Sequence, residues 1–104
     1  MSSPLKGIKI LDLTHMLAGP YGTMVLADLG AEIIKIEPPL KGEITRNLLK
    51  NDPDYSVDGV GAYHLTLGRN KKSLTLDLKS DPGKHIFYQL VKTVSYTHLR
   101  AHET

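Results

Sequence analysis

The chain opens with two short aliphatic segments on either side of a helical pattern, and this arrangement limits its possible folds more than any other feature. Ile8–Leu13 is rich in β-branched and aliphatic side chains, which favour a buried strand. Apolar residues recur at helical spacing across Pro20–Leu29, and Gly30 is suited to a left-handed C-cap. A second aliphatic run, Ala31–Ile36, follows. Strand, helix and strand predict a βαβ unit with parallel strands and a right-handed crossover.

A long polar connection follows this unit. Pro38–Pro39 ends the second strand, because proline cannot donate to a sheet ladder. The segment from Lys41 to Gly61 is turn-rich, and we expect one helical turn in it near Arg46–Lys50. Long connections of this kind inside compact domains are often functional.

The second half of the chain repeats the alternation of strand and helix. Ser73–Leu78 alternates between apolar and polar residues and predicts a third strand. Asp81 is expected to cap a helix that begins at Pro82 and ends near Thr93. The sequence therefore predicts an α/β fold, a Rossmann-like parallel sheet with flanking helices, truncated, in the order β-α-β-loop-β-α.

Length and composition confine the chain to one small domain. It has 104 residues, of which 40% are hydrophobic and 23% charged, and its formal net charge is +2. That charge is too small to indicate a nucleic acid or an anionic membrane as partner, and no apolar run approaches the roughly 20 residues of a membrane span. The absence of cysteine excludes disulfides, thiolate zinc sites and cysteine nucleophiles. No secretory signal is visible, so we expect a cytoplasmic protein.

The loop that opens the first helix partly matches a dinucleotide-binding turn. Leu17, Gly19 and Gly22 occupy the spacing of G-x-G-x-x-G. Glu37 lies 37 − 17 = 20 positions after Leu17, where an acidic residue would bind a ribose. Leu17 replaces the glycine of the tight turn and Pro20 lacks an N–H, so both argue against a nicotinamide or flavin. In the structural alternative, Gly19 permits close packing of helix on strand and Glu37 is a solvated strand end.

Two further groups of residues could carry chemistry. The segment Leu67–Lys72 holds three cations, an asparagine and a glycine, and could bind a phosphorylated ligand with help from Arg46; the alternative is a solvated turn. Asp12 and His15 lie near the carboxyl end of the first strand and could form an acid–base pair. In the alternative, Asp12 and Thr14 cap the turn and His15 is a half-buried loop residue.

The last residues depart from the pattern. Val94–Thr104 contains no run of strand-forming residues, although an α/β fold should deliver another strand there. His98 and His102 are four residues apart and could present two metal ligands on a helix, but no third ligand is near. We expect an unstructured tail with two incidental histidines.

Several segments follow one another in an order and spacing that is specific when they are taken together. They are Pro4–Thr14, Leu17–Tyr21, Leu26–Ala31, Ile34–Glu37, Arg69–Ser73 and Leu76–Lys79. From about Pro4 to Thr93 the chain resembles the N-terminal part of the family III CoA-transferases. This superfamily includes carnitine/crotonobetaine CoA-transferase, formyl-CoA transferase and α-methylacyl-CoA racemase.

The resemblance implies a CoA-binding, Rossmann-like domain of a much longer protein that forms an interlocked homodimer. In the transferases of this family an aspartate attacks an acyl-CoA thioester. An anhydride and an aspartyl-CoA thioester follow, before CoA passes to an acceptor carboxylate. The substrates would be an acyl-CoA and a carboxylic acid, with no metal and no tightly bound cofactor. The alternatives are an acyl-CoA racemase or isomerase of the same superfamily, a non-catalytic nucleotide-binding module, and a dinucleotide-dependent oxidoreductase domain.

Single positions also follow from the resemblance. Leu17 and Ala18 match the loop that touches CoA. A second segment matches the lining of its nucleotide part and comprises Gly68, Arg69, Asn70 and Lys71. Some members carry an arginine just after the acid that ends the second strand, but this chain has Pro38 there and lacks that contact.

The resemblance leaves this chain without a catalytic residue. The nucleophilic aspartate of the family lies beyond Thr104, so we expect no turnover from these residues alone. Residues 1–93 would form the N-terminal part of the CoA-binding domain. Residues 94–104 would be an unrelated tail, disordered or artefactual, because the family continues with an Ala-Asp-Val-Leu-like strand. The aspartates that do not correspond to the nucleophile are Asp12, Asp28, Asp52, Asp54, Asp58, Asp77 and Asp81.

Overall fold

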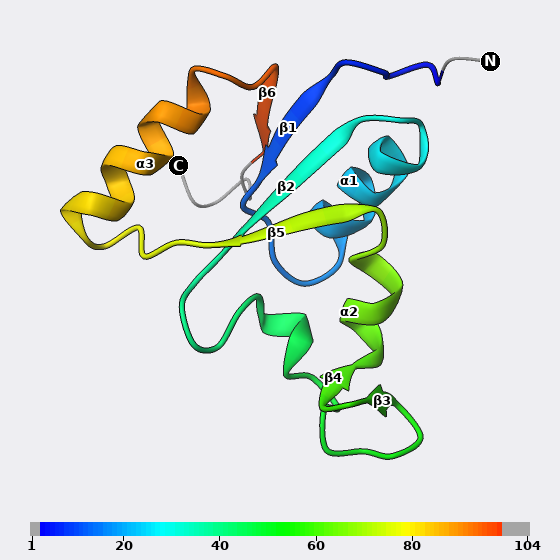
Figure 1. Cartoon of the computed structure of the whole chain (residues 1–104). Helices are drawn as coiled ribbons and strands as arrows, with labels where there is room; N and C mark the ends of the chain where they lie inside the picture. Colours follow the sequence, from blue (N-terminus) through cyan, green and yellow to red (C-terminus); the bar gives the residue numbers. More distant parts are fainter. Residues whose placement is uncertain (1–2, 99–104) are drawn as a thin grey trace.

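A computed structural model describes residues 3–98, and its centre is a parallel sheet with the strand order β5-β2-β1-β6 (Figure 1). β1 (Lys9–Asp12) pairs with β2 (Glu32–Glu37) on one side and with β6 (Tyr96–His98) on the other. β5 (Lys71–Thr75) adds to the free side of β2. The predicted α/β fold with a parallel sheet is confirmed.

Helices cover both faces of this sheet (Figure 1). α1 (Ala18–Asp28) connects β1 to β2 and packs on one face, where Ile10, Ala27, Ala31 and Ile33 form a buried core. α3 (Asp81–Val91) follows β5 and packs on the opposite face. The core of that face consists of Leu11, Ile36 and Leu76, with the partly buried Phe87 and Leu90 of α3 against it.

The long connection between β2 and β5 contains more structure than the sequence pattern indicates. A 3₁₀ turn, η1 (Ile44–Arg46), is followed by an antiparallel hairpin of β3 (Ser56–Val57) and β4 (Val60–Gly61). α2 (Ala62–Leu67) then leads back to the sheet. The helical turn predicted near Arg46–Lys50 therefore ends where it was expected to begin, and α2 was not predicted. α2 is only six residues long and has no side-chain cap, so it leaves no start signal in the sequence.

Three predicted boundaries shift by a few residues. α1 begins at Ala18, so Pro20 lies inside its first turn, where a missing N–H costs nothing. Ser80, not Asp81, caps α3, because its hydroxyl accepts a hydrogen bond from the Gly83 N–H at 3.1 Å. The third strand covers Lys71–Thr75 and not Ser73–Leu78.

The prediction of an unstructured tail after Thr93 is wrong for Tyr96–His98, which form β6 beside β1. The Ser95 N–H donates to the Lys9 carbonyl at 2.8 Å and begins this pairing. Backbone hydrogen bonding alone can recruit such a segment, whatever its side chains. His102 lies outside the described residues. Between residues 3 and 98 no cluster of three metal-binding side chains is found, and no helix there is long and apolar enough to cross a membrane.

Candidate functional site

On the face that α1 covers, the strands change from apolar to charged toward their carboxyl ends. Ile10 and Ile33 are buried, and the next residues on the same face are Asp12 and Lys35, since side chains two positions apart in a strand share a face. Asp12, Lys35 and Glu37 are only 0%, 5% and 2% exposed. Charged groups are therefore buried at the end of the sheet where open α/β proteins bind ligands.

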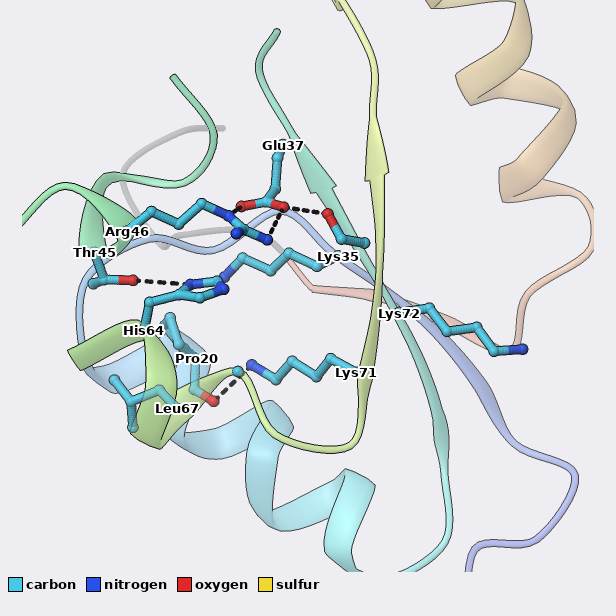
Figure 2. A pocket seen from close by; sticks show the side chains of 11 residues that line it. Pro20, Lys35, Glu37, Thr45, Arg46, His64, Leu67, Lys71 and Lys72 are labelled. Atoms are coloured by element: carbon cyan, nitrogen blue, oxygen red, sulfur yellow. Dashed lines mark hydrogen bonds and ion pairs between the residues drawn. The ribbon is translucent and has the colours of Figure 1, made fainter. Parts of the chain in front are cut away.

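Lys35 and Glu37 line an inner cavity between the sheet, the start of α1, η1 and α2 (Figure 2). Its volume of about 40 Å³ is enough for water but far too small for a nucleotide. Lys71 points toward the carbonyl of Pro20, whereas Lys72 leaves β5 in the opposite direction (Figure 2). The lining residues are Pro20, Lys35, Glu37, Thr45, Arg46, His64, Leu67, Gly68, Lys71, Lys72 and Ser73.

Asp12 ties the end of β1 to α1 and β5. Its carboxylate accepts hydrogen bonds from the Thr14 N–H (2.9 Å), the Thr23 hydroxyl (2.6 Å) and the Lys71 ammonium (3.2 Å), and Lys35 Nζ lies 3.8 Å away. Burial acts to raise the pKa of Asp12, but Lys35, the hydroxyls and Lys71 together hold it below its ordinary value. Asp12 is thus a buried, ionised anchor.

Glu37 joins three segments at the end of β2. Arg46 binds its carboxylate through Nε (2.7 Å) and Nη2 (2.9 Å), and the Glu43 N–H donates at 2.8 Å. The Ser73 hydroxyl of β5 donates to the same carboxylate. Burial opposes ionisation, but these donors outweigh it and lower the pKa of Glu37 to about 2.

Glu43 links the connection to the loop after β1. Its Oε1 accepts from the Met16 N–H (2.9 Å), and its Oε2 accepts from the Thr45 N–H (2.7 Å) and the Thr45 hydroxyl. His64 of α2 lies 4.0 Å from Oε2. Burial, followed by the nearby Arg46 charge, lowers the pKa of His64, so its neutral form is favoured.

A larger hollow, which we call the outer groove, opens outside the carboxyl ends of β1, β2 and β5. Its deeper part has a volume of about 430 Å³, in the range of ligand pockets. That part is lined by Leu13, His15, Ile36, Glu37, Pro38, Pro39, Leu76, Asp77, Leu78 and Lys79. A shallower part shares His15, Pro38 and Pro39 and adds Met16, Lys41, Gly42, Ile44 and Asn47.

The structure brings some of the predicted CoA-binding residues together. Leu17 and Ala18 are exposed at the start of α1. Lys71 contacts the same helical turn, since its ammonium lies 3.0 Å from the Pro20 carbonyl. Its side chain is buried, with only 3% exposed. Burial lowers the pKa of Lys71. Gly68 lines the inner cavity, and a Cβ there would come within 2.8 Å of the His64 carbonyl.

Arg69 and Asn70 lie elsewhere. The Arg69 guanidinium binds Asp28 at 2.6 Å, and the Asn70 amide donates to the same carboxylate at 2.8 Å. Asp28 is the last residue of α1, so this exposed cluster sits at the opposite end of the helix from Leu17. The cationic segment Leu67–Lys72 is therefore divided. Gly68 and Lys71 line the inner cavity, whereas Arg69 and Asn70 bind the last residue of α1.

Several other interpretations are corrected. Asp12 does not pair with His15: its donors are those above, and His15 Nδ1 accepts from the Ile44 N–H at 3.5 Å. Glu37 is neither free for a ribose nor a solvated strand end, because it is buried with its donors in place. Gly19 does permit a close approach, but to the loop after β1 and not to the strand, since a Cβ there would lie 2.4 Å from the Thr14 side chain.

The sequence analysis missed Lys35, Glu43 and His64 as members of this charged cluster. One signal was present for Lys35, a lone cation inside an aliphatic strand, since a buried charge requires a partner. Glu43 and His64 lie in a segment without periodicity, and nothing local to them indicates burial.

The profile of CoA-transferase family III matches residues 5–95. The chain belongs to this family. The match covers β1 to α3 and therefore both hollows. It reaches Ser95, one residue before β6.

Curated relatives and solved structures agree with this assignment. The chain is 44% identical over 93 residues to formyl-CoA:oxalate CoA-transferase of Rhodopseudomonas palustris, covering 89% of this chain and 21% of that protein. It is 47% identical over 87 residues to human succinyl-CoA:glutarate CoA-transferase, covering 84% and 19%. It thus spans about a fifth of the length of these relatives.

The fold is likewise found in solved structures of longer proteins. A CaiB/BaiF family protein from Brucella suis matches with a TM-score of 0.82 and 34% identity, over 93% of this chain and 25% of that one. A hypothetical protein from Mycobacterium tuberculosis matches with a TM-score of 0.79 and 36% identity, over 92% and 25%.

Proposed function

We propose that this chain is the coenzyme A-binding part of an enzyme that transfers CoA from an acyl-CoA to a carboxylic acid. The observation that carries the proposal is the outer groove, at the carboxyl ends of the strands in a chain of this family. Lys41 and Lys79 line it and would attract the phosphates of CoA.

Leu17 and Ala18 would contact CoA at the start of α1. The N-terminal turn of this helix has no acidic residue, and Leu17 makes no side-chain cap, so its free N–H groups favour an anion. Gly68 and Lys71 would support this turn indirectly and not touch CoA, because the Lys71 ammonium donates to the Pro20 carbonyl inside it. Arg69 and Asn70 would need to exchange Asp28 for the nucleotide in order to contribute.

The whole reaction would require groups outside this chain. We propose that the nucleophilic aspartate lies further along a longer protein, and that this protein is an interlocked homodimer in the cytoplasm. We therefore expect the 104-residue chain to show no turnover. An assay with the substrate pairs named for its relatives, formyl-CoA with oxalate and succinyl-CoA with glutarate, would test this, and any measurable transfer would contradict it.

Ligand titration of the purified chain tests the binding proposal. Calorimetry should detect CoA binding and no NAD binding, whereas NAD binding alone would refute the proposal. Leu17→Asp and Leu17→Asn provide a matched pair, since both residues are good helix caps but only aspartate adds a negative charge. We expect CoA binding to be several-fold weaker in Leu17→Asp than in Leu17→Asn, and equal affinities would remove α1 from the site.

A further inference from the structure

We propose that Glu43 is a positioning residue for the ligand loop, which we define as His15–Ala18. In this proposal its carboxylate holds the Met16 backbone in place, so that the neighbouring Leu17 and Ala18 are presented to CoA. The inference rests on the proposed function for its ligand, but its geometric part can be tested without CoA.

The carboxylate of Glu43 divides its two oxygens between segments that are far apart in the sequence. Oε1 accepts from the Met16 N–H at 2.9 Å, across 27 positions of the chain. Oε2 accepts from the Thr45 N–H at 2.7 Å and from the Thr45 hydroxyl, which keeps the side chain fixed within its own turn. The first contact is therefore the one that acts on the ligand loop.

The contact falls at a strained point of that loop. Met16 has a φ of 70°, a left-handed conformation that an unbranched but bulky side chain adopts only when its surroundings impose it. Met16 also lines the outer groove, next to His15. The acceptor that the structure provides for the Met16 N–H in this conformation is Glu43.

The residue before the ligand loop is held in a similar way. Asp12 accepts from the Thr14 N–H at 2.9 Å, and Lys35 Nζ lies 3.8 Å from a carboxylate oxygen of Asp12 and also of Glu43. Two buried carboxylates on either side of one ammonium thus hold the backbone at Thr14 and at Met16, on both sides of His15. Lys35 balances charges that would otherwise repel each other.

Glu43 itself cannot touch a ligand in the outer groove. It is 0% exposed, and both of its oxygens are occupied by donors of this chain. Its effect on binding must therefore pass through Met16, which is what distinguishes a positioning residue from a contact residue.

The experiment compares Glu43→Ala with Ile33→Val, a variant destabilised in the apolar core away from the loop. Amide hydrogen exchange is followed at Met16, and CoA affinity is measured by calorimetry under conditions where both variants remain folded. Loss of a hydrogen bond to a buried carboxylate should accelerate Met16 exchange and weaken CoA binding, each by about tenfold. Ile33→Val should change neither by more than about twofold.

Glu43→Gln is the second variant and decides the matter if Glu43→Ala does not fold. Glutamine has one acceptor oxygen, so it can serve Met16 or Thr45 but not both. In Glu43→Gln, CoA affinity should fall only if Met16 is the amide that loses protection. Glu43→Asp retains both acceptor oxygens and should therefore bind CoA almost as tightly as the unsubstituted chain.

Each outcome bears on a different part of the inference. Unchanged CoA affinity in a variant whose Met16 amide has lost protection would overturn the positioning role. Unchanged Met16 exchange in Glu43→Ala would overturn the contact on which that role depends. If the unsubstituted chain binds no CoA, the proposed function fails, and Met16 exchange still decides whether Glu43 holds the loop.

Discussion

The βαβ unit and the connection that follows it are held together by opposite kinds of interaction. Within the unit, α1 packs on the sheet through Ile10, Ala27, Ala31 and Ile33, all apolar and buried. The connection from Pro38 to Gly68 is held against the same sheet by ion pairs and hydrogen bonds of buried carboxylates. The first region depends on burial of apolar surface, which tolerates changes of pH and salt, and the second depends on ionised side chains.

The largest expected effect comes from breaking the second region at Glu37. Glu37→Ala should lower the free energy of unfolding by about 3 kcal/mol, because it leaves the buried Glu43 N–H without an acceptor and removes the acceptor shared by the partly exposed Arg46 and the Ser73 hydroxyl. Urea unfolding followed by circular dichroism measures this. Glu32→Ala, which removes the half-buried partner of the exposed Lys72, serves as the control and should have a far smaller effect. Equal losses would mean that the connection does not depend on this junction.

Acid should weaken the connection before it affects the apolar core. Since the pKa of Glu37 is about 2 in the folded chain against an ordinary 4.5, its contribution is complete above pH 4.5 and is lost as the pH falls toward 2. The loss should be on the order of 2 kcal/mol. The pKa values of Asp12 and His64 are also lowered by folding, so both groups likewise reduce the stability of the folded chain as the pH falls. For His64 this loss begins below about pH 6.5. Urea unfolding at several pH values should show that the free energy of unfolding falls as the pH falls. Glu37→Gln should make this dependence flatter between pH 4.5 and 2. An unchanged pH dependence in Glu37→Gln would contradict the role given to Glu37.

The apolar region should respond differently. Ile33→Val removes one methyl group from the core under α1 and should cost about 1 kcal/mol, by the same amount at pH 7 and at pH 4. Urea unfolding at both values would check this. A cost that changes with pH would show that the two regions are coupled.

The smallest effect is expected at the end of α1. Arg69→Ala removes a pair with Asp28 in which both partners are exposed, so stability should not change measurably at physiological salt. If CoA is recruited by Arg69, the same variant should still weaken CoA binding. Thermal unfolding and calorimetry on one preparation would separate these two roles.

The same contrast explains what could be predicted from the sequence. Ile8–Leu13 and Ala31–Ile36 were recognised because a buried strand is a run of consecutive β-branched and aliphatic residues, and only the boundaries moved. β6 escaped prediction because it is recruited by backbone hydrogen bonds to β1, which depend little on side-chain type. α2 escaped because a six-residue helix without a cap carries no periodic signal.

The candidate site could be predicted only in part, for a related reason. Leu17 and Ala18 were proposed from the resemblance, and they are exposed at the start of α1. The cationic segment was found from its composition, but composition cannot tell that Lys71 points inward while Arg69 points to Asp28. Glu43 and Met16 are 27 positions apart, and their contact exists only once the connection has folded back over the sheet.

The junction at Glu37 also limits how pieces of related proteins can be exchanged. Its carboxylate receives donors from Glu43, Arg46 and Ser73, which lie on two different stretches of chain. A chimaera that replaced only the stretch around η1, or only β5, would separate partners that belong together. The segments that carry Glu37, Glu43, Arg46 and Ser73 should therefore be taken from the same parent protein, even where each segment folds well in its own parent.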